Sequence, residues 1–164
     1  MFVGDILVVE SDATSGAELV TALLHLAESK ERVIRTFPSA EAALAWCDEA
    51  DMPPALIVSG AELSQGMSGI ALCRVLRAKE SPCKNIPVVI VTGASDRSAC
   101  FFEAIAAGAT GFLPKPVDRK TLLSVASDCI RVFSARLQSL AIFDQLASRE
   151  GATCGSLGSI TGMV

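Results

Sequence analysis

Three side chains that could take part in chemistry follow short apolar stretches of this sequence. Glu10 follows ILVV, Thr92 ends VVIVT, and Lys115 follows GFLP. A carboxylate, a hydroxyl and an amine in one place can hold ions, but a single carboxylate makes a poor Mg²⁺ site because that cation prefers several oxygens. His25 is the only histidine and the six cysteines form no C-x-x-C pair, so the sequence predicts no metal centre.

A parallel β-sheet would bring these three residues together. Five segments have the pattern of strands. Four of them are short apolar runs, Asp5–Val9, Ala55–Ser59, Val88–Thr92 and Gly111–Leu113, and the fifth, Arg32–Phe37, alternates like an edge strand. Helical patterns separate the runs, and a long helix follows the last one, from about Asp118. The expected fold is an α/β, doubly wound (βα)5 domain with helices on both faces of the sheet.

In a fold of this kind the working site lies at the carboxyl ends of the strands. The residues at those ends are Glu10, Ser11, Ser59, Gly60, Thr92, Gly93, Lys115 and Pro116. The sequence has no glycine-rich phosphate loop after the first strand and no recognisable catalytic triad. Both observations argue against a flavodoxin-like enzyme or a nucleotide-binding protein.

The composition restricts the class of protein. A chain of 164 residues, 51% of them hydrophobic and 20% charged, suits one domain with a tail and is unlike a disordered protein. The net charge of −4 gives no bulk attraction to nucleic acid or to an anionic membrane. The N-terminus lacks the features of a signal peptide and the apolar runs are too short to span a membrane, so we expect a cytosolic protein with reduced, mostly buried cysteines.

Six segments carry a resemblance to a known family. They are ILVVES, PPALIVSG, GMSGIALCRVLR, IPVVIVTGASD, AIAAGATGF and LPKPV, in that order. Over about residues 4–134 the chain resembles the CheY-like receiver domains of bacterial two-component response regulators. The resemblance implies the strand order 2-1-3-4-5. It also implies the family's chemistry, in which an aspartate after the third strand takes a phosphoryl group while an acidic pair after the first strand holds Mg²⁺.

Five residues match the family's pattern position by position. By this resemblance Thr92 is the hydroxyl that binds a phosphoryl oxygen, and Lys115 is the lysine that pairs with the phosphate. Pro116 follows a peptide bond that is usually cis in the family. Glu10 takes the first acidic position with one extra methylene, and Phe112 takes the place of the aromatic switch residue.

Two departures from the family's pattern change the mechanism. Gly60 stands where the phosphorylated aspartate should be, and Ser11 stands where the second acid should be. Glycine has no side chain to phosphorylate, and Glu10 alone is a poor Mg²⁺ site. The resemblance therefore implies a degenerate receiver, without cofactor, metal or enzymatic activity, that contacts a kinase, another regulator or an effector. We expect the amine of Lys115 to contact Glu10, or an anion held between Lys115 and Thr92.

Other interpretations of these residues remain open. Glu10 and Lys115 are also compatible with a solvated acid and an ordinary surface lysine. A stand-in acceptor such as Ser59 or Asp12, or a small ligand in the emptied pocket, would preserve a phosphorelay or sensing role. Asp12 is also a good helix cap. The side chain of Glu62 could lean into the vacated space.

The last helix is predicted to be longer than the fold requires. Apolar residues continue at a 3-4 spacing, and they are Leu123, Ala126, Ile130, Phe133, Leu137 and Leu140. We therefore divide the chain into a receiver domain (1–134), a C-terminal helical extension (135–150) and a Gly-rich flexible tail (151–164).

Phe133, Leu137 and Leu140 are candidates for an interface on this extension. They could form a homodimer or a stalk that leads to an output module, and the alternative is that they fold back on their own domain. The resemblance adds a second contact surface, formed by the fourth helix (about Asp96–Ala107), the fifth strand and the last helix.

Overall fold

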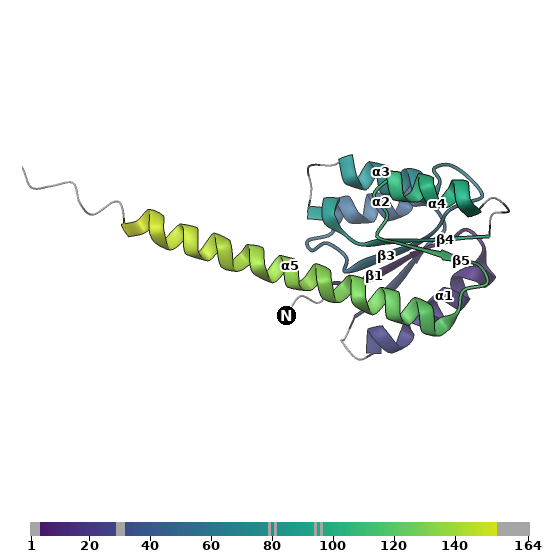
Figure 1. Cartoon of the computed structure of the whole chain (residues 1–164), viewed down its shortest axis with the longest axis horizontal. Coiled ribbons are helices and arrows are strands. Elements are labelled where there is room, and N and C mark those ends of the chain that lie inside the picture. The colour runs from purple at the N-terminus through teal and green to yellow at the C-terminus, as the bar shows by residue number, and fades with distance from the viewer. Residues whose placement is uncertain are drawn as a thin grey trace, which may run out of the picture.

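Five parallel strands form the centre of the domain. A computed structural model describes residues 4–28, 32–78, 80, 82–93, 95 and 97–153 of the 164. The strands are β1 (Ile6–Val9), β2 (Ile34–Phe37), β3 (Leu56–Gly60), β4 (Val88–Thr92) and β5 (Gly111–Pro114). Their order is β2-β1-β3-β4-β5 and all four neighbouring pairs are parallel, so the predicted sheet is confirmed (Figure 1).

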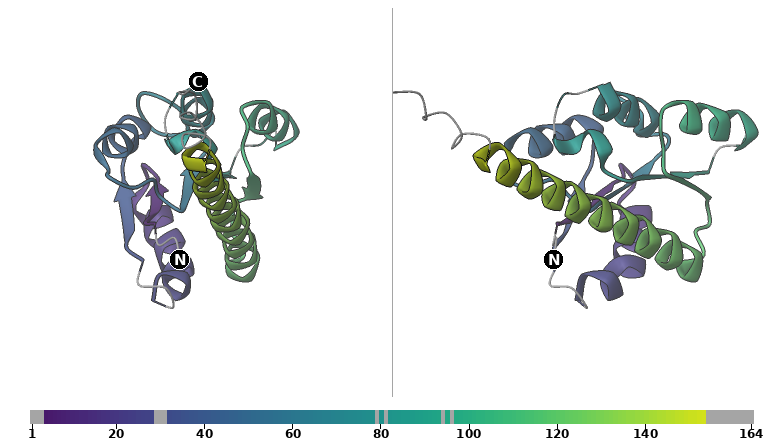
Figure 2. Two further views of the ribbon diagram at one scale, coloured as in Figure 1. Left: turned by 90° about the vertical axis from the view of Figure 1, so that its left-hand side faces the viewer. Right: turned by 60° about the vertical axis from the view of Figure 1, so that its left-hand side comes forward.

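Helices cover both faces of this sheet. They are α1 (Ala13–Glu28), α2 (Ala40–Glu49), α3 (Gly69–Ala78), α4 (Arg97–Ala106) and α5 (Arg119–Thr153), and a 3-10 turn, η1 (Pro82–Asn85), precedes β4. Helices α1 and α5 lie side by side on one face, while α2, α3 and α4 cover the other (Figure 1 and Figure 2). This is the predicted doubly wound arrangement.

Side chains of the central strands alternate between two apolar clusters. Val9, Ile57 and Ile90 belong to the cluster under α2, α3 and α4, and Val8 and Val58 belong to the cluster under α1 and α5. All are essentially inaccessible to solvent. A parallel sheet between two layers of helices buries both of its faces, which explains why the central strands are apolar at nearly every position.

Short polar side chains fix the starts of three helices. Asp12 Oδ1 accepts the Ser15 N–H of α1 at 2.7 Å, and Asp118 Oδ2 accepts the Thr121 N–H of α5 at 2.8 Å. Ser39 caps the start of α2, since its Oγ accepts the Ala42 N–H at 3.2 Å. Each side chain satisfies an N–H group that has no partner inside its helix.

Helix α5 continues far beyond the sheet. It has 35 residues, and its outer half projects from the domain (Figure 1). It ends at Thr153, so the prediction that the tail begins at residue 151 is wrong by three residues, and the rest of that tail lies outside the described residues. No helix in the described part of the chain is both long and apolar enough to cross a bilayer.

One predicted interface residue is part of the core instead. Phe133 is buried in the cluster that contains Cys83 and Ile86 of the segment before β4, and Leu137 is partly buried against that cluster. Leu140, one turn further, is exposed. The predicted interface is therefore wrong for Phe133 and partly wrong for Leu137, because α5 meets an apolar surface next to η1 before it leaves the domain.

Candidate functional site

The carboxyl ends of four strands bring the predicted site residues to one edge of the sheet. Strand β1 leads into Glu10, β3 ends at Gly60, β4 ends at Thr92, and β5 leads into Lys115. Backbone hydrogen bonds fix these ends: the Glu10 N–H donates to the Phe37 carbonyl at 3.0 Å, and the Lys115 N–H donates to the Thr92 carbonyl at 2.7 Å.

An ion pair crosses this edge. Lys115 Nζ donates to Glu10 Oε2 at 2.8 Å, which is the contact that the sequence predicted. The Glu10 side chain is 3% exposed and that of Lys115 is 31% exposed. The other oxygen of Glu10, Oε1, accepts the Asp12 N–H at 3.1 Å. Both carboxylate oxygens are thus engaged, as burial of a charged group requires.

The Glu10 carboxylate lies over Gly60. A Cβ atom added at position 60 would be 2.9 Å from Glu10 Oε2, closer than real Cβ contacts allow. The side chain of Glu62 is exposed, so it is Glu10 rather than Glu62 that lies against this position. The space next to the backbone of residue 60 is thus taken by a carboxylate that comes from β1.

Ser11 holds a loop. Its Oγ accepts the Ser64 N–H at 3.0 Å, which ties the β3–α3 loop to the end of β1. Glu41 of α2 holds the same loop from the other side, because its Oε1 accepts the Met67 N–H at 2.6 Å. This hydrogen bond lowers the pKa of the Glu41 carboxyl below its usual value. No pattern in the sequence predicts the Glu41 contact, which joins residues 26 positions apart.

Two further predicted residues connect the strand ends to α4. Thr92 is buried, and its Oγ1 accepts a long hydrogen bond of 3.6 Å from the Cys100 thiol of α4. Phe112 is half-buried and makes an edge-to-face contact with Phe101 of α4, with ring centroids 5.5 Å apart. The peptide bond between Lys115 and Pro116 is cis, as the family resemblance implied.

The candidate stand-in acceptors are engaged elsewhere. Ser59 is inaccessible to solvent and its Oγ donates to the Gly60 carbonyl at 3.0 Å. Asp12 caps α1, and the hydrogen bond from the Ser15 N–H lowers its pKa. Among the described residues, no group of three or more histidine, cysteine or acidic side chains is arranged to hold a metal ion.

Comparisons with known proteins agree with this geometry. Residues 6–127 match the family model of the response regulator receiver domain. A comparison with curated proteins finds no match. Among solved structures, similar ones include the receiver domain of a signal transduction histidine kinase from Syntrophus aciditrophicus. It is 26% identical, with a TM-score of 0.66 over 78% of this chain and 90% of that one.

Two other solved structures extend the comparison. Full-length FixJ from B. japonicum is 27% identical, with a TM-score of 0.67, and the match covers 91% of this chain and 68% of FixJ. The chemotaxis response regulator CheY4 of Vibrio cholerae is 23% identical, with a TM-score of 0.65 over 78% of this chain and 99% of CheY4. With the family model spanning most of the chain and the sheet in the order 2-1-3-4-5, this protein belongs to the response regulator receiver domain family.

Proposed function

We propose that this chain is a degenerate receiver that takes no phosphoryl group at position 60 and signals through protein contacts. The observation that carries the proposal is the position of Glu10, whose Oε2 is 2.8 Å from Lys115 Nζ and 2.9 Å from where a Cβ of residue 60 would be. The lysine that would pair with a phosphate already has an anionic partner. Gly60 itself offers no nucleophile.

The other parts of a phosphoryl-transfer site support the same conclusion. Ser11, at the second acidic position, is used to hold the β3–α3 loop. The carboxylates nearest to the site, Glu10 and Asp12, already accept hydrogen bonds from the protein or pair with Lys115. A phosphoryl group arriving here would therefore find Lys115 already paired with a carboxylate and little provision for Mg²⁺.

The contact surface that we propose for a signalling partner lies on α4 and β5. Phe101, Phe102 and Ile105 are exposed on α4, and Phe102 is 70% exposed. The ring of Phe112 in β5 packs edge-to-face against the ring of Phe101. Large apolar side chains gathered on one exposed helix favour a protein partner, such as a kinase, another regulator or an effector. The net charge of −4 gives no bulk attraction to nucleic acid or to an anionic membrane, which supports a protein as the partner.

The phosphoryl part of the proposal is tested by intact mass. The chain is incubated with acetyl phosphate and Mg²⁺ beside a receiver domain that has the aspartate, and beryllofluoride binding serves as a second probe. We expect no added phosphate on this chain. A gain of one phosphate mapped to Ser59 or Asp12 would favour the phosphorelay role instead.

The contact part is tested by capture of partners on the immobilised chain. Phe102→Ser should reduce the capture of any specific partner, whereas Met52→Ser, which removes an exposed apolar side chain in the segment between α2 and β3, should not. Equal capture by the wild type, Phe102→Ser and Met52→Ser would show that the α4 surface is not the contact.

A further inference from the structure

The outer half of α5 has an apolar face that stays exposed within the described part of the chain. Four large side chains are exposed there: Leu140, Ile142, Phe143 and Leu146, with Phe143 76% exposed. At about 100° per residue these side chains span an arc of roughly 160°. The remaining arc has the polar residues Gln138, Asp144, Gln145, Ser148 and Arg149.

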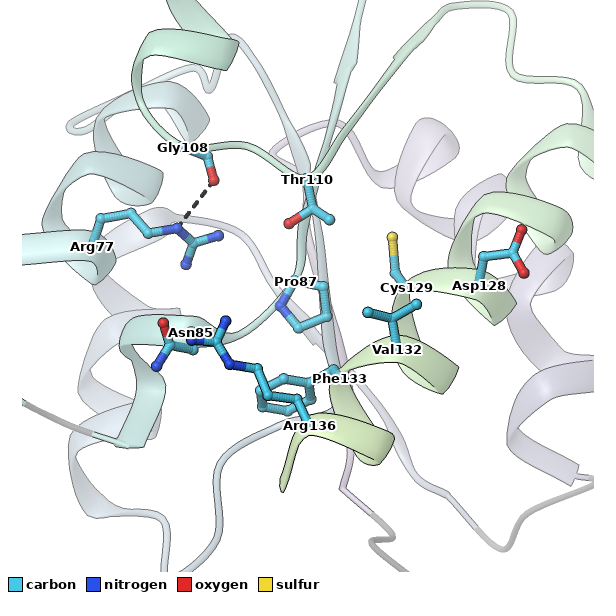
Figure 3. A pocket seen from close by; sticks show the side chains of 10 residues that line it. All are labelled: Arg77, Asn85, Pro87, Gly108, Thr110, Asp128, Cys129, Val132, Phe133 and Arg136. Carbon is cyan, nitrogen blue, oxygen red and sulfur yellow. Dashed lines mark hydrogen bonds between the residues drawn. The ribbon is translucent and has the colours of Figure 1, made fainter. Parts of the chain in front are cut away.

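Toward the domain, the same helix face leads into a pocket. Val132, which is exposed and points in nearly the same direction as Phe143, lines a cavity of about 430 Å³ next to η1 (Figure 3). Phe133 and Pro87 form its apolar floor, and Arg77 and Arg136 approach it from the α3 side and from α5.

The pocket is cationic in an otherwise acidic chain. Arg77 is fixed, because its Nε donates to the Gly108 carbonyl at 3.0 Å and its Nη1 donates to the Lys84 carbonyl at 2.9 Å. No hydrogen bond joins the exposed Arg136 guanidinium to another described residue. The acid of the lining, Asp128, pairs with Arg131 at 3.1 Å. Two guanidinium groups therefore face a site that is open to solvent.

We propose that α5 pairs antiparallel with α5 of a second copy of this chain, about a two-fold axis near Phe143. The exposed apolar residues are centred on Phe143, so the two-fold axis places Leu140 of one copy opposite Leu146 of the other. The same axis places the last turn of each α5 beside Arg136 and the pocket of the partner. This dimer goes beyond the proposed function, since it involves neither position 60 nor the α4 surface.

Charge favours the antiparallel direction. The carboxyl end of a helix carries partial negative charge, and the last turn of α5 has no basic residue of its own to offset it. The partner's pocket would supply Arg136 and Arg77. A parallel pair would instead place Arg136 opposite Arg136. It would also bring both domains to the same end of the helix pair, where the residues that line each pocket already lie around Val132.

The first experiment measures mass in solution by sedimentation of the full chain over a range of concentrations. We expect a dimer that Phe143→Glu converts to a monomer with unchanged helicity. Phe102→Glu, a matched change at a similarly exposed phenylalanine on α4, should stay dimeric. A monomeric wild-type chain, or a dimer lost only in the Phe102 variant, would overturn the proposal.

The second experiment tests direction with a spin label at Arg131→Cys, in a chain whose Cys100, Cys129 and Cys154 are serine. The antiparallel pair places the two labels about 36 Å apart along the axis, from the 1.5 Å rise per residue, and a parallel pair would give about 20 Å or less. The shorter distance would overturn the antiparallel arrangement.

Arg136→Glu should weaken the dimer about tenfold or more while Arg136→Lys retains it, and equal dimer strength in both would remove the role of the pocket. None of these results depends on the phosphorylation test, so the two proposals can fail separately.

Discussion

Lys115 Nζ and Glu10 Oε2 lie 2.8 Å apart although 105 positions separate the two residues in the chain. Glu10 reaches the lysine across the backbone of Gly60, where a side chain at residue 60 would collide with it. A side chain at position 60 would therefore require the Glu10 carboxylate to shift from its place beside Lys115.

Removing the charge of Glu10 should destabilise the fold. In Glu10→Gln, Lys115 loses its anionic partner while two thirds of its side chain stays covered. We expect a loss of about 1–3 kcal/mol in the free energy of unfolding, less than for a fully buried pair because Lys115 reaches solvent. Urea denaturation at neutral pH measures it. Glu80→Gln, which breaks the exposed Lys84–Glu80 pair, should cost about 0.5 kcal/mol or less. Equal effects in the two variants would contradict a structural role for the buried pair.

Restoring the acceptor should require more than one substitution. Gly60→Asp alone places a second carboxylate against Glu10 and should neither gain phosphate nor fold as stably as the wild type. Shortening the neighbour with Glu10→Asp makes room, and Ser11→Asp adds the second acid that Mg²⁺ needs. Intact mass after acetyl phosphate and Mg²⁺ should show phosphate mainly on the triple variant, because such groups act as a unit. Full phosphorylation of Gly60→Asp alone would mean that Glu10 moves aside freely.

The loop contact of Glu41 predicts a dependence on pH. The Met67 N–H lowers the pKa of the Glu41 carboxyl in the folded state from 4.5, so its contribution to stability is present above that pH and is lost as the pH falls through the lowered value. Glu41→Ala should therefore unfold at lower urea concentration than the wild type at pH 7. The difference should shrink as the pH falls below 4.5. Glu49→Ala, exposed on the same helix, should follow the wild type at both pH values.

Phe133 should behave as a core residue. Phe133→Ala should lower the free energy of unfolding by about 3–5 kcal/mol, because it leaves a cavity beside Cys83 and Ile86. The same change at the exposed Phe102 should stay within about 0.5 kcal/mol. Chemical denaturation of the two variants distinguishes them. A mild effect at Phe133 would mean that this side chain is available for an interface after all.

Periodicity and the family's segments were enough to predict the sheet, its strand order and the Glu10–Lys115 contact. The three central strands, β1, β3 and β4, are short runs of buried residues, and the family resemblance supplied their order. The contact followed from charge, since a lysine at a partly enclosed strand end needs an anion and Glu10 was the remaining matched acid.

The sequence failed where residues far apart in the chain meet without a repeating pattern. The 3-4 spacing through Phe133 and Leu137 has the same appearance whether the helix packs on its own domain or on a partner. The exposed face from Leu140 to Leu146 is centred on a different side of the helix from that stripe, and Asp144 occupies the position where the stripe would continue. The Glu41 contact was also missed, because a surface glutamate near the start of a helix normally needs no explanation beyond the helix itself.

The Glu10–Lys115 pair also bears on how long a signal could last. In a receiver that carries a phosphoryl group, hydrolysis of that group limits the active period. Here the charged pair forms with the fold itself and has no bond that hydrolysis could remove. The duration of a signal passed on by such a domain would be set by how fast the chain is made and degraded and by how fast it leaves its partner. Its response would then follow the amount of the protein present.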